Sequence, residues 1–137
     1  MKIFRFFIAF TMFFISTNSL LAQVYNYKAT SVSVLERNEK GAWGKWSEFK
    51  KSPVLITFNA NKDRFIINSR DIQLYKITAY MEKVSTGNDD ILGFQCEDME
   101  GATCMLMIVT RKKEKNRLQF YINYSDLKLV YNIYETQ

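Results

Sequence analysis

The sequence predicts an all-β fold: an antiparallel meander of eight or nine strands that closes into a small closed or partly open barrel, with a two-sheet β-sandwich as the alternative. From Val24 onward, apolar residues recur at every second position and not at the spacing of a helix face. Short polar turns separate these stretches at regular intervals. The single proline, Pro53, stands at a strand start, where no ladder donor is needed.

The alternating stretches define the strands in chain order. We expect strands at residues 24–37, 45–50 (the weakest pattern), 54–59, 64–68, 72–84, 91–97, 102–110, 117–124 and 127–134. In the first of these the apolar positions change from odd numbers, up to Ala29, to even numbers, from Val32. In the strand at 72–84 they change between Leu74 and Tyr75. Each change of face predicts a β-bulge or a sharp bend.

The amino-terminal residues have the three parts of a secretory signal peptide. Lys2 and Arg5 precede an apolar run at 6–15, and a polar patch then leads to a cleavage region for which we expect cleavage after Ala22. The run is shorter than the ~18 to 20 residues that span a bilayer. The sequence therefore predicts a signal peptide at 1–22 and one β domain at 23–137, periplasmic or secreted, without a transmembrane segment in the mature form.

Composition excludes several classes of function. The chain has no histidine, which removes histidine-based general bases, triads and metal sites. Loss of residues 1–22 leaves 17 basic against 14 acidic residues, a net charge of +3. Because these charges are mixed along the chain, we expect no nucleic-acid partner. We also expect no metal, no cofactor and no enzymatic activity.

Cys96 and Cys104 are the only cysteines. If 99–101 forms a three-residue loop with Gly101 in the left-handed conformation, the two cysteines lie directly across a hairpin. In an oxidising compartment this predicts a disulfide. The alternative is two buried thiols that pack as small apolar side chains.

Carboxylates are densest between residues 89 and 100. Successive loops of a meander alternate between the two ends of the sheet, so we expect Asp89 and Asp90 at the opposite end from Asp98 and Glu100. A carboxylate-dependent hydrolase is therefore only a remote alternative function.

We expect the longer loops to gather at one end of the barrel, where they form a mouth: 38–44, 59–63, 85–90 and 111–116. The candidate ligand-binding residues are those of these loops: Trp43, Asn61, Asp89, Asp90, Arg111, Lys112, Lys113 and Lys115. Four cations within five residues repel one another and extend the last loop. Together with an indole ring they suit an anionic or sugar-like ligand. The alternative is that these loops are only solvated.

The strand at 102–110 is apolar on both faces, because Met105, Met107 and Val109 point away from its other apolar residues. Either another segment of the chain covers this outer face, or the face forms a homodimer interface.

Two resemblances add expectations. The segment Gly41-Ala42-Trp43 resembles the Gly-x-Trp element of the lipocalin and wider calycin families, which implies a ligand-holding β-barrel. The chain as a whole, with its leader ending Leu-Leu-Ala-Gln and its repeated hairpins, resembles the small uncharacterised secreted β proteins of Bacteroidetes-type bacteria. That resemblance implies export.

The leading function is thus an exported, non-enzymatic binding module that holds a small ligand or a partner at the long-loop end of the barrel. The alternative is a protein-interaction or inhibitor domain that uses an exposed strand face, with Met105, Met107 and Val109 and the tyrosines Tyr121, Tyr131 and Tyr134.

Overall fold

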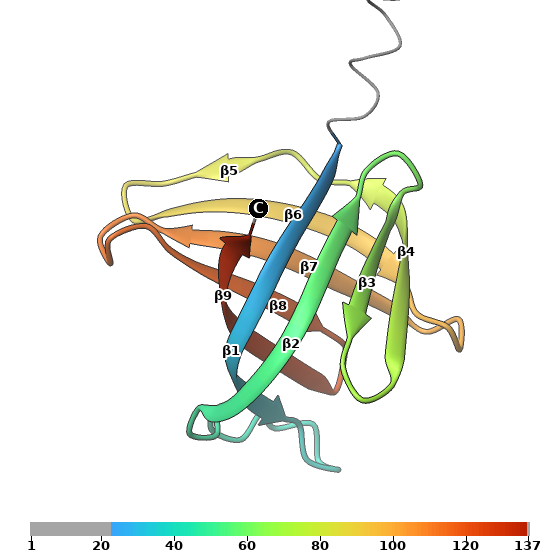
Figure 1. The fold of residues 1–137 in the computed structure, drawn as a ribbon. Helices are drawn as coiled ribbons and strands as arrows, with labels where there is room; N and C mark the ends of the chain where they lie inside the picture. The colour runs from blue at the N-terminus through green and yellow to red at the C-terminus, as the bar shows by residue number, and fades with distance from the viewer. Residues whose placement is uncertain (1–22, 137) are drawn as a thin grey trace, which may run out of the picture.

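The computed structural model describes residues 23–136, which form a closed eight-stranded antiparallel β-barrel with one further strand outside the ring (Figure 1). The predicted signal peptide lies outside the described residues. The strands are β1 (Val24–Glu36), β2 (Lys50–Asn59), β3 (Arg64–Asn68), β4 (Ile72–Tyr80), β5 (Val84–Ser85), β6 (Asp89–Glu97), β7 (Thr103–Arg111), β8 (Arg117–Asn123) and β9 (Leu127–Thr136). Within this part of the chain no helix is long and apolar enough to cross a membrane.

Sequence neighbours pair around the ring, and two further pairings close it. β1 pairs with both β2 and β9, while β4 pairs with β6, so that no edge is left open around the eight strands. β5 pairs only with the first residues of β6 and lies outside the ring. The predicted all-β barrel is confirmed.

The strand predicted at 45–50 is wrong, and the one predicted at 72–84 is two strands. Residues 44–49 follow β1 through hydrogen bonds from Gly44 N to Glu36 O (2.9 Å) and from Ser47 N to Val34 O (2.8 Å). These bonds are three residues apart, which does not match the two-residue repeat of a ladder, so the segment is irregular. Residues 37–49 therefore make a single long connection between β1 and β2.

The first predicted bulge is confirmed, and the second lies further along the chain. The pairing of β1 with both neighbours shifts between Ala29 and Ser31. In β4 the shift occurs between Ile77 and Ala79, in the pairing with β6. The apolar residues before Tyr75 misled the prediction because they lie on the outer face of the sheet, where Ile72 is 65% exposed.

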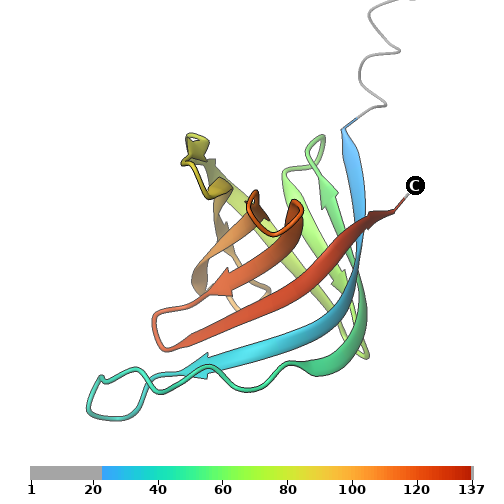
Figure 2. The same cartoon turned by 90° about the vertical axis from the view of Figure 1, so that its left-hand side faces the viewer.

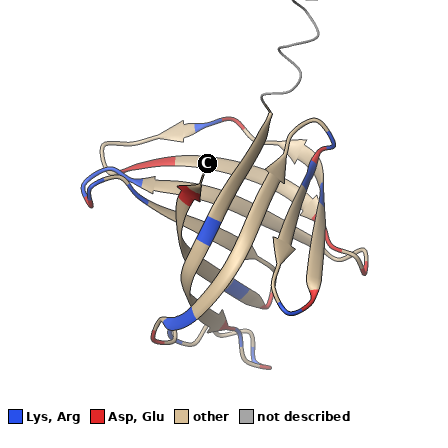
Figure 3. Cartoon of the chain, in the orientation of Figure 1, with Lys and Arg blue, Asp and Glu red and all other residues tan. Residues whose placement is uncertain are grey.

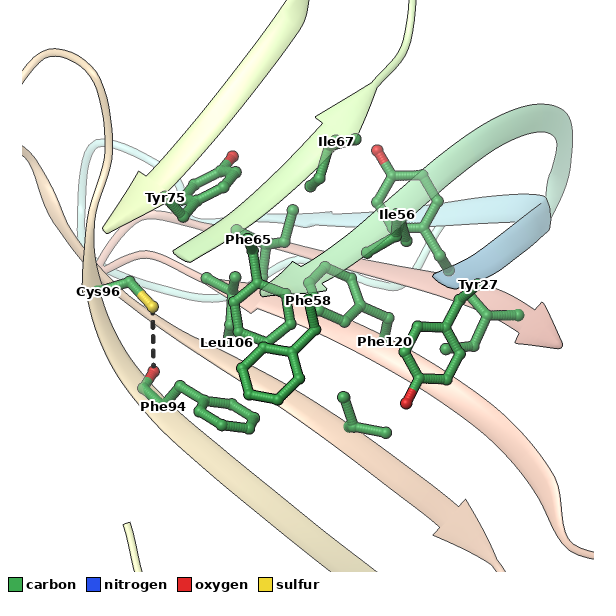
Figure 4. Close-up of a cluster of buried hydrophobic side chains, with 14 of the residues drawn as sticks. Tyr27, Ile56, Phe58, Phe65, Ile67, Tyr75, Phe94, Cys96, Leu106 and Phe120 are labelled. Carbon is green, nitrogen blue, oxygen red and sulfur yellow. Dashed lines mark hydrogen bonds between the residues drawn. The ribbon is translucent and has the colours of Figure 1, made fainter. Parts of the chain in front are cut away.

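Side chains fill the interior of the barrel (Figure 4). Phe65 lies at the centre, with ring centroids 4.7 Å from Phe58, 5.0 Å from Phe94 and 5.5 Å from Phe120. All four rings are buried. Aromatic rings at these separations are in direct contact. The core of the barrel is therefore a packed aromatic cluster.

The cysteines occupy the predicted positions, but the predicted disulfide is wrong. Cys96 pairs with Cys104, and Gly101 has a φ of 82°. Because Asp98 N donates to Ala102 O at 2.9 Å, the cysteine pair two residues away is also of the hydrogen-bonded kind, whose Cα atoms are more widely spaced. Both cysteines are free and buried, and Cys96 Sγ donates to Phe94 O at 3.7 Å.

We expect thiol titration of the unfolded, unreduced protein to find both cysteines free. The folded protein should react with neither at pH 8, because burial raises the pKa of Cys96 to about 12 and that of Cys104 to about 11. The measurement is reaction with a coloured disulfide reagent, with and without denaturant. An unfolded chain that shows no reactive thiol would contradict the structure.

Candidate functional site

Four side chains on the outside of the barrel are buried. Ser33, Val109, Gln119 and Val130 are only 1–4% exposed. They point outward because side chains alternate along a strand and their neighbours, such as Phe120, belong to the interior core. A residue on the outer face is buried only where another segment covers it. Here that segment is 44–49, which runs beside the second half of β1 (Figure 2).

Ser47 and Trp46 attach this segment to the barrel wall. Ser33 Oγ donates to Ser47 O at 2.6 Å, and Val34 N donates to Ser47 Oγ at 2.9 Å. The ring of Trp46 reaches over the sheet to Tyr121 on β8, edge to face, with 6.4 Å between centroids. The irregular conformation of 44–49 thus directs an indole across the outer face of the barrel.

Between this segment and the loops at 86–88 and 112–116 lies a groove of about 620 Å³. This volume falls within the ~300–1,000 Å³ of small-molecule sites. Its floor is the outer face of β1, β9, β8 and β7. The lining residues are Ser33, Trp46, Ser47, Phe49, Asn88, Asp89, Arg111, Lys113, Glu114, Arg117, Gln119, Tyr121 and Val130.

Arg111 organises one half of the groove floor. It ends β7 directly opposite Asp89, the first residue of β6. Its guanidinium donates to Asp89 Oδ2 (2.9 Å), to Gln119 Oε1 (2.9 Å) and to the Tyr121 hydroxyl (2.6 Å). Three partners on three nitrogens fix the plane of the guanidinium.

Asn132 on β9, which does not itself line the groove, continues this network through Gln119 and Arg117. Its Oδ1 accepts from Gln119 Nε2 (3.0 Å) and from Arg117 Nη1 (2.7 Å), and its Nδ2 donates to Ser31 Oγ (3.0 Å). Arg117 Nη2 also pairs with Glu114 Oε1 at 3.0 Å. A continuous chain of hydrogen bonds therefore runs across β6, β7, β8, β9 and β1, and it holds the floor in one arrangement.

The ionic groups of the groove leave one excess positive charge. Asp89 is paired with Arg111 and Glu114 with Arg117, whereas Lys113 has no hydrogen bond or ion pair among residues 23–136. Figure 3 shows charged residues of both signs mainly in the connections all around the barrel, including the β7–β8 loop, while the strands are largely uncharged. The groove is thus a mildly cationic site.

The structure brings most of the predicted site residues together. Asp89, Arg111 and Lys113 line the groove. Lys112 pairs with Asp90 at 2.9 Å and also donates to Ser85 and Thr86, which ties β5 to the loop. Hydrogen bonds from Ser85 and from Lys112 lower the pKa of Asp90. Lys115 is exposed in the same loop. Arg111 and Lys112 are ion-paired, so the predicted run of mutually repelling cations is wrong.

Trp43 and Asn61 lie elsewhere. The ring of Trp43 is 4.7 Å from Lys128 Nζ and 5.7 Å from the Arg37 guanidinium, beside the β8–β9 turn. This turn lies at the opposite end of β8 from the β7–β8 loop at 112–116, the cationic loop. Asn61 belongs to the β2–β3 connection, which lies at the predicted end of the barrel because β2 and β7 run in the same direction, but it does not line the groove. The predicted grouping of Trp43 with this loop is wrong because it counted a strand at 45–50, and one extra strand moves a loop to the other end. The Gly41–Trp43 element likewise lies in a connection.

Four groove residues were not predicted from the sequence, namely Trp46, Phe49, Gln119 and Ser33, and Tyr121 was predicted only for an interaction face. Along β8, polar Gln119 and Tyr121 alternate with core residues, which is the pattern of an ordinary solvent-facing side. One usable signal was present: large aromatic residues at 43, 46 and 49 recur every third position, which fits neither a strand nor a flexible loop.

The acidic residues divide between the two ends of the barrel, as predicted. Asp89 and Asp90 begin β6, whereas Asp98 and Glu100 lie in the β6–β7 turn. A hydrogen bond from the Tyr124 hydroxyl (2.8 Å) lowers the pKa of Asp98. Among residues 23–136 no three His, Cys, Asp or Glu side chains are grouped so that they could hold a metal ion.

The outer face of β7 is covered in part by the chain itself. Val109 is 2% exposed, and Trp46 borders a second hollow of about 260 Å³ together with Met107 and Val109. Val109 is therefore not available to a partner surface, whereas Met105 and Met107 are half-buried.

Comparison of the chain with protein-family models, curated proteins and solved structures finds no match.

Proposed function

We propose that this protein is an exported, non-enzymatic binding module that holds a small ligand in the groove on the outer face of its barrel. The observation that carries the proposal is the combination of an open groove of about 620 Å³ with a floor of hydrogen-bonded polar groups. Two aromatic side chains beside that floor, Trp46 and Phe49, are 43% and 47% exposed. Export is proposed from the leader-like sequence at 1–22.

The filled interior supports a site outside the barrel. A lipocalin-like interior site needs empty volume, yet Phe58, Phe65, Phe94 and Phe120 occupy the centre. The hydrogen-bonded polar residues of the floor, by contrast, line the open groove outside the barrel. Preorganised polar groups beside exposed aromatic rings are typical of small-molecule sites.

The chemistry of the groove favours binding over catalysis. Its two carboxylates, on Asp89 and Glu114, each accept a hydrogen bond from an arginine within 3.0 Å. A carboxylate-dependent hydrolase places two carboxyl groups on either side of the scissile bond, whereas both of these carboxylates hold arginine side chains. Histidine is missing from the sequence, and both thiols are buried in the core.

The alternative, a protein-interaction or inhibitor domain, has less support. Of the residues that suggested it, Tyr131 belongs to the interior core, Tyr121 to the hydrogen-bonded floor, and Val109 is buried. Three of these residues are still accessible to a partner protein or a second copy of the chain: Tyr134, which is 49% exposed, and the half-buried Met105 and Met107.

The two tryptophans provide the test of this proposal. Trp43→Phe leaves Trp46 as the single indole, at the groove, and Trp46→Phe leaves Trp43, at the opposite end of β8. In a screen of mono- and oligosaccharides, amino acids and small carboxylic acids, we expect ligands that change the emission of Trp43→Phe but leave that of Trp46→Phe unchanged. Ligands that act on both variants equally would place the site outside the groove.

A further inference from the structure

The geometry points to an acidic sugar as the ligand: a hexuronate unit whose carboxylate pairs with Lys113 while its ring packs on Trp46 or Phe49. This inference rests on the proposed function, because it names the class of ligand for the same groove. Charge, exposed aromatic surface and the polar groups of the rim each support it.

The charge balance of the groove matches one negative charge. The pairs Asp89–Arg111 and Glu114–Arg117 are internally neutral. Lys113 lines the same groove, and its ammonium group has no partner among residues 23–136. An ammonium donates up to three hydrogen bonds, and its bonds to a carboxylate are charge-assisted. A ligand with a single carboxylate neutralises the groove, whereas a doubly charged phosphate ester gives it an excess negative charge.

The aromatic side chains supply flat apolar surface. Trp46 and Phe49 keep nearly half of their surface exposed, although the segment that carries them is anchored to the barrel through Ser47. Trp46 contacts Tyr121 in a T-shaped arrangement, with 79° between the ring planes, and keeps 43% of its surface exposed to a ligand. Burial of such surface against the C–H face of a sugar ring is favourable.

The rim offers partners for hydroxyl groups. The side-chain amide of Asn88 has no hydrogen bond with any residue of the described chain, and an amide both donates and accepts. Asp89 and Glu114 each give one oxygen to an arginine and retain the other as an acceptor. A ring with several hydroxyl groups uses donors and acceptors together, which a simple carboxylic acid does not.

A matched pair of ligands tests the inference. Methyl β-D-glucuronoside and methyl β-D-glucoside differ only at C6, which is a carboxylate in the first and a hydroxymethyl group in the second. By calorimetric titration of the protein at low salt, we expect the glucuronoside to bind at least about tenfold more tightly, the effect of one charge-assisted hydrogen bond. Lys113→Gln should reduce its affinity to that of the glucoside. Lys115→Gln, a cation of the same loop that does not line the groove, is the control and should change the affinity by less than about twofold.

The other outcomes separate this inference from the proposed function. Equal binding of the two glycosides, lost in Trp46→Ala, would overturn the acidic ligand and leave the groove as the binding site. Absence of binding by either glycoside would also overturn the acidic sugar, and the tryptophan screen then decides independently whether the groove binds another class of ligand. If Lys113→Gln and Lys115→Gln reduce the affinity for the glucuronoside equally, the positive charge of the whole loop attracts the ligand. That result would overturn the specific role of Lys113.

Discussion

Replacement of Phe65 by alanine is expected to lower the free energy of unfolding by about 3–5 kcal/mol, as for large aromatic truncations in packed cores. Phe65 has no exposed surface and contacts the rings of Phe58, Phe94 and Phe120. Its removal leaves a cavity enclosed on all sides, which the surrounding strands of a closed barrel are poorly able to collapse around. Urea denaturation followed by circular dichroism measures the change.

Ile72→Ala is the control for this substitution. Ile72 is also a large apolar residue of the same sheet, but it is 65% exposed, so its truncation should change stability by less than about 0.5 kcal/mol. A loss below about 1 kcal/mol for Phe65→Ala would contradict a filled barrel and would restore the barrel interior as a possible ligand site.

The second large effect is expected for Arg111→Ala. Loss of the guanidinium removes the partner of Asp89 and leaves Gln119 Oε1, in a side chain only 4% exposed, with the weaker bond from Tyr121 at 3.3 Å. A buried polar group that loses its charged partner costs about 1–3 kcal/mol. The same change disorders the groove floor, so we expect ligand binding to fall more than tenfold. Thermal unfolding and titration measure the two effects.

Lys112→Ala is the matched control. Lys112 follows Arg111 directly and pairs with Asp90 as Arg111 pairs with Asp89, both at 2.9 Å, but it does not line the groove. Exposed ion pairs contribute about 0–1 kcal/mol, so Lys112→Ala should be milder and should leave ligand affinity nearly unchanged. If the two variants behave alike, the Arg111 network is only a surface ion pair.

The sequence predicts most of this fold because alternation of polarity determines it locally. Phe120 and Ile122 alternate with polar residues, and the register of Cys96 opposite Cys104 follows from the three-residue loop 99–101, which ends with Gly101. The strand predicted at 45–50 is wrong, because hydrogen bonds from this part of the chain to β1 come from Gly44 and Ser47, three residues apart. Local polarity does not reveal such a pairing.

The site was predictable only in part. Asp89, Arg111 and Lys113 are recognisable from loop position and charge. Gln119 and Ser33 are not, because a polar residue on the outer side of a strand normally faces water, and only the tertiary placement of Trp46 and Ser47 over the sheet buries them. The cysteines illustrate the same limit: their adjacency follows from the hairpin, while their free state depends on the geometry of the pair.

The central claim is that this barrel binds its ligand outside, in the groove, and not within its interior. Amide and indole chemical-shift mapping during titration with methyl β-D-glucuronoside tests it most directly. We predict shifts for the Trp46 indole, Asn88, Lys113 and the Gln119 side-chain amide, with the interior residues Phe65 and Phe94 unchanged. The account would be contradicted if the signals of the groove residues did not shift while those of the core residues, or of Trp43 at the opposite end of β8, did.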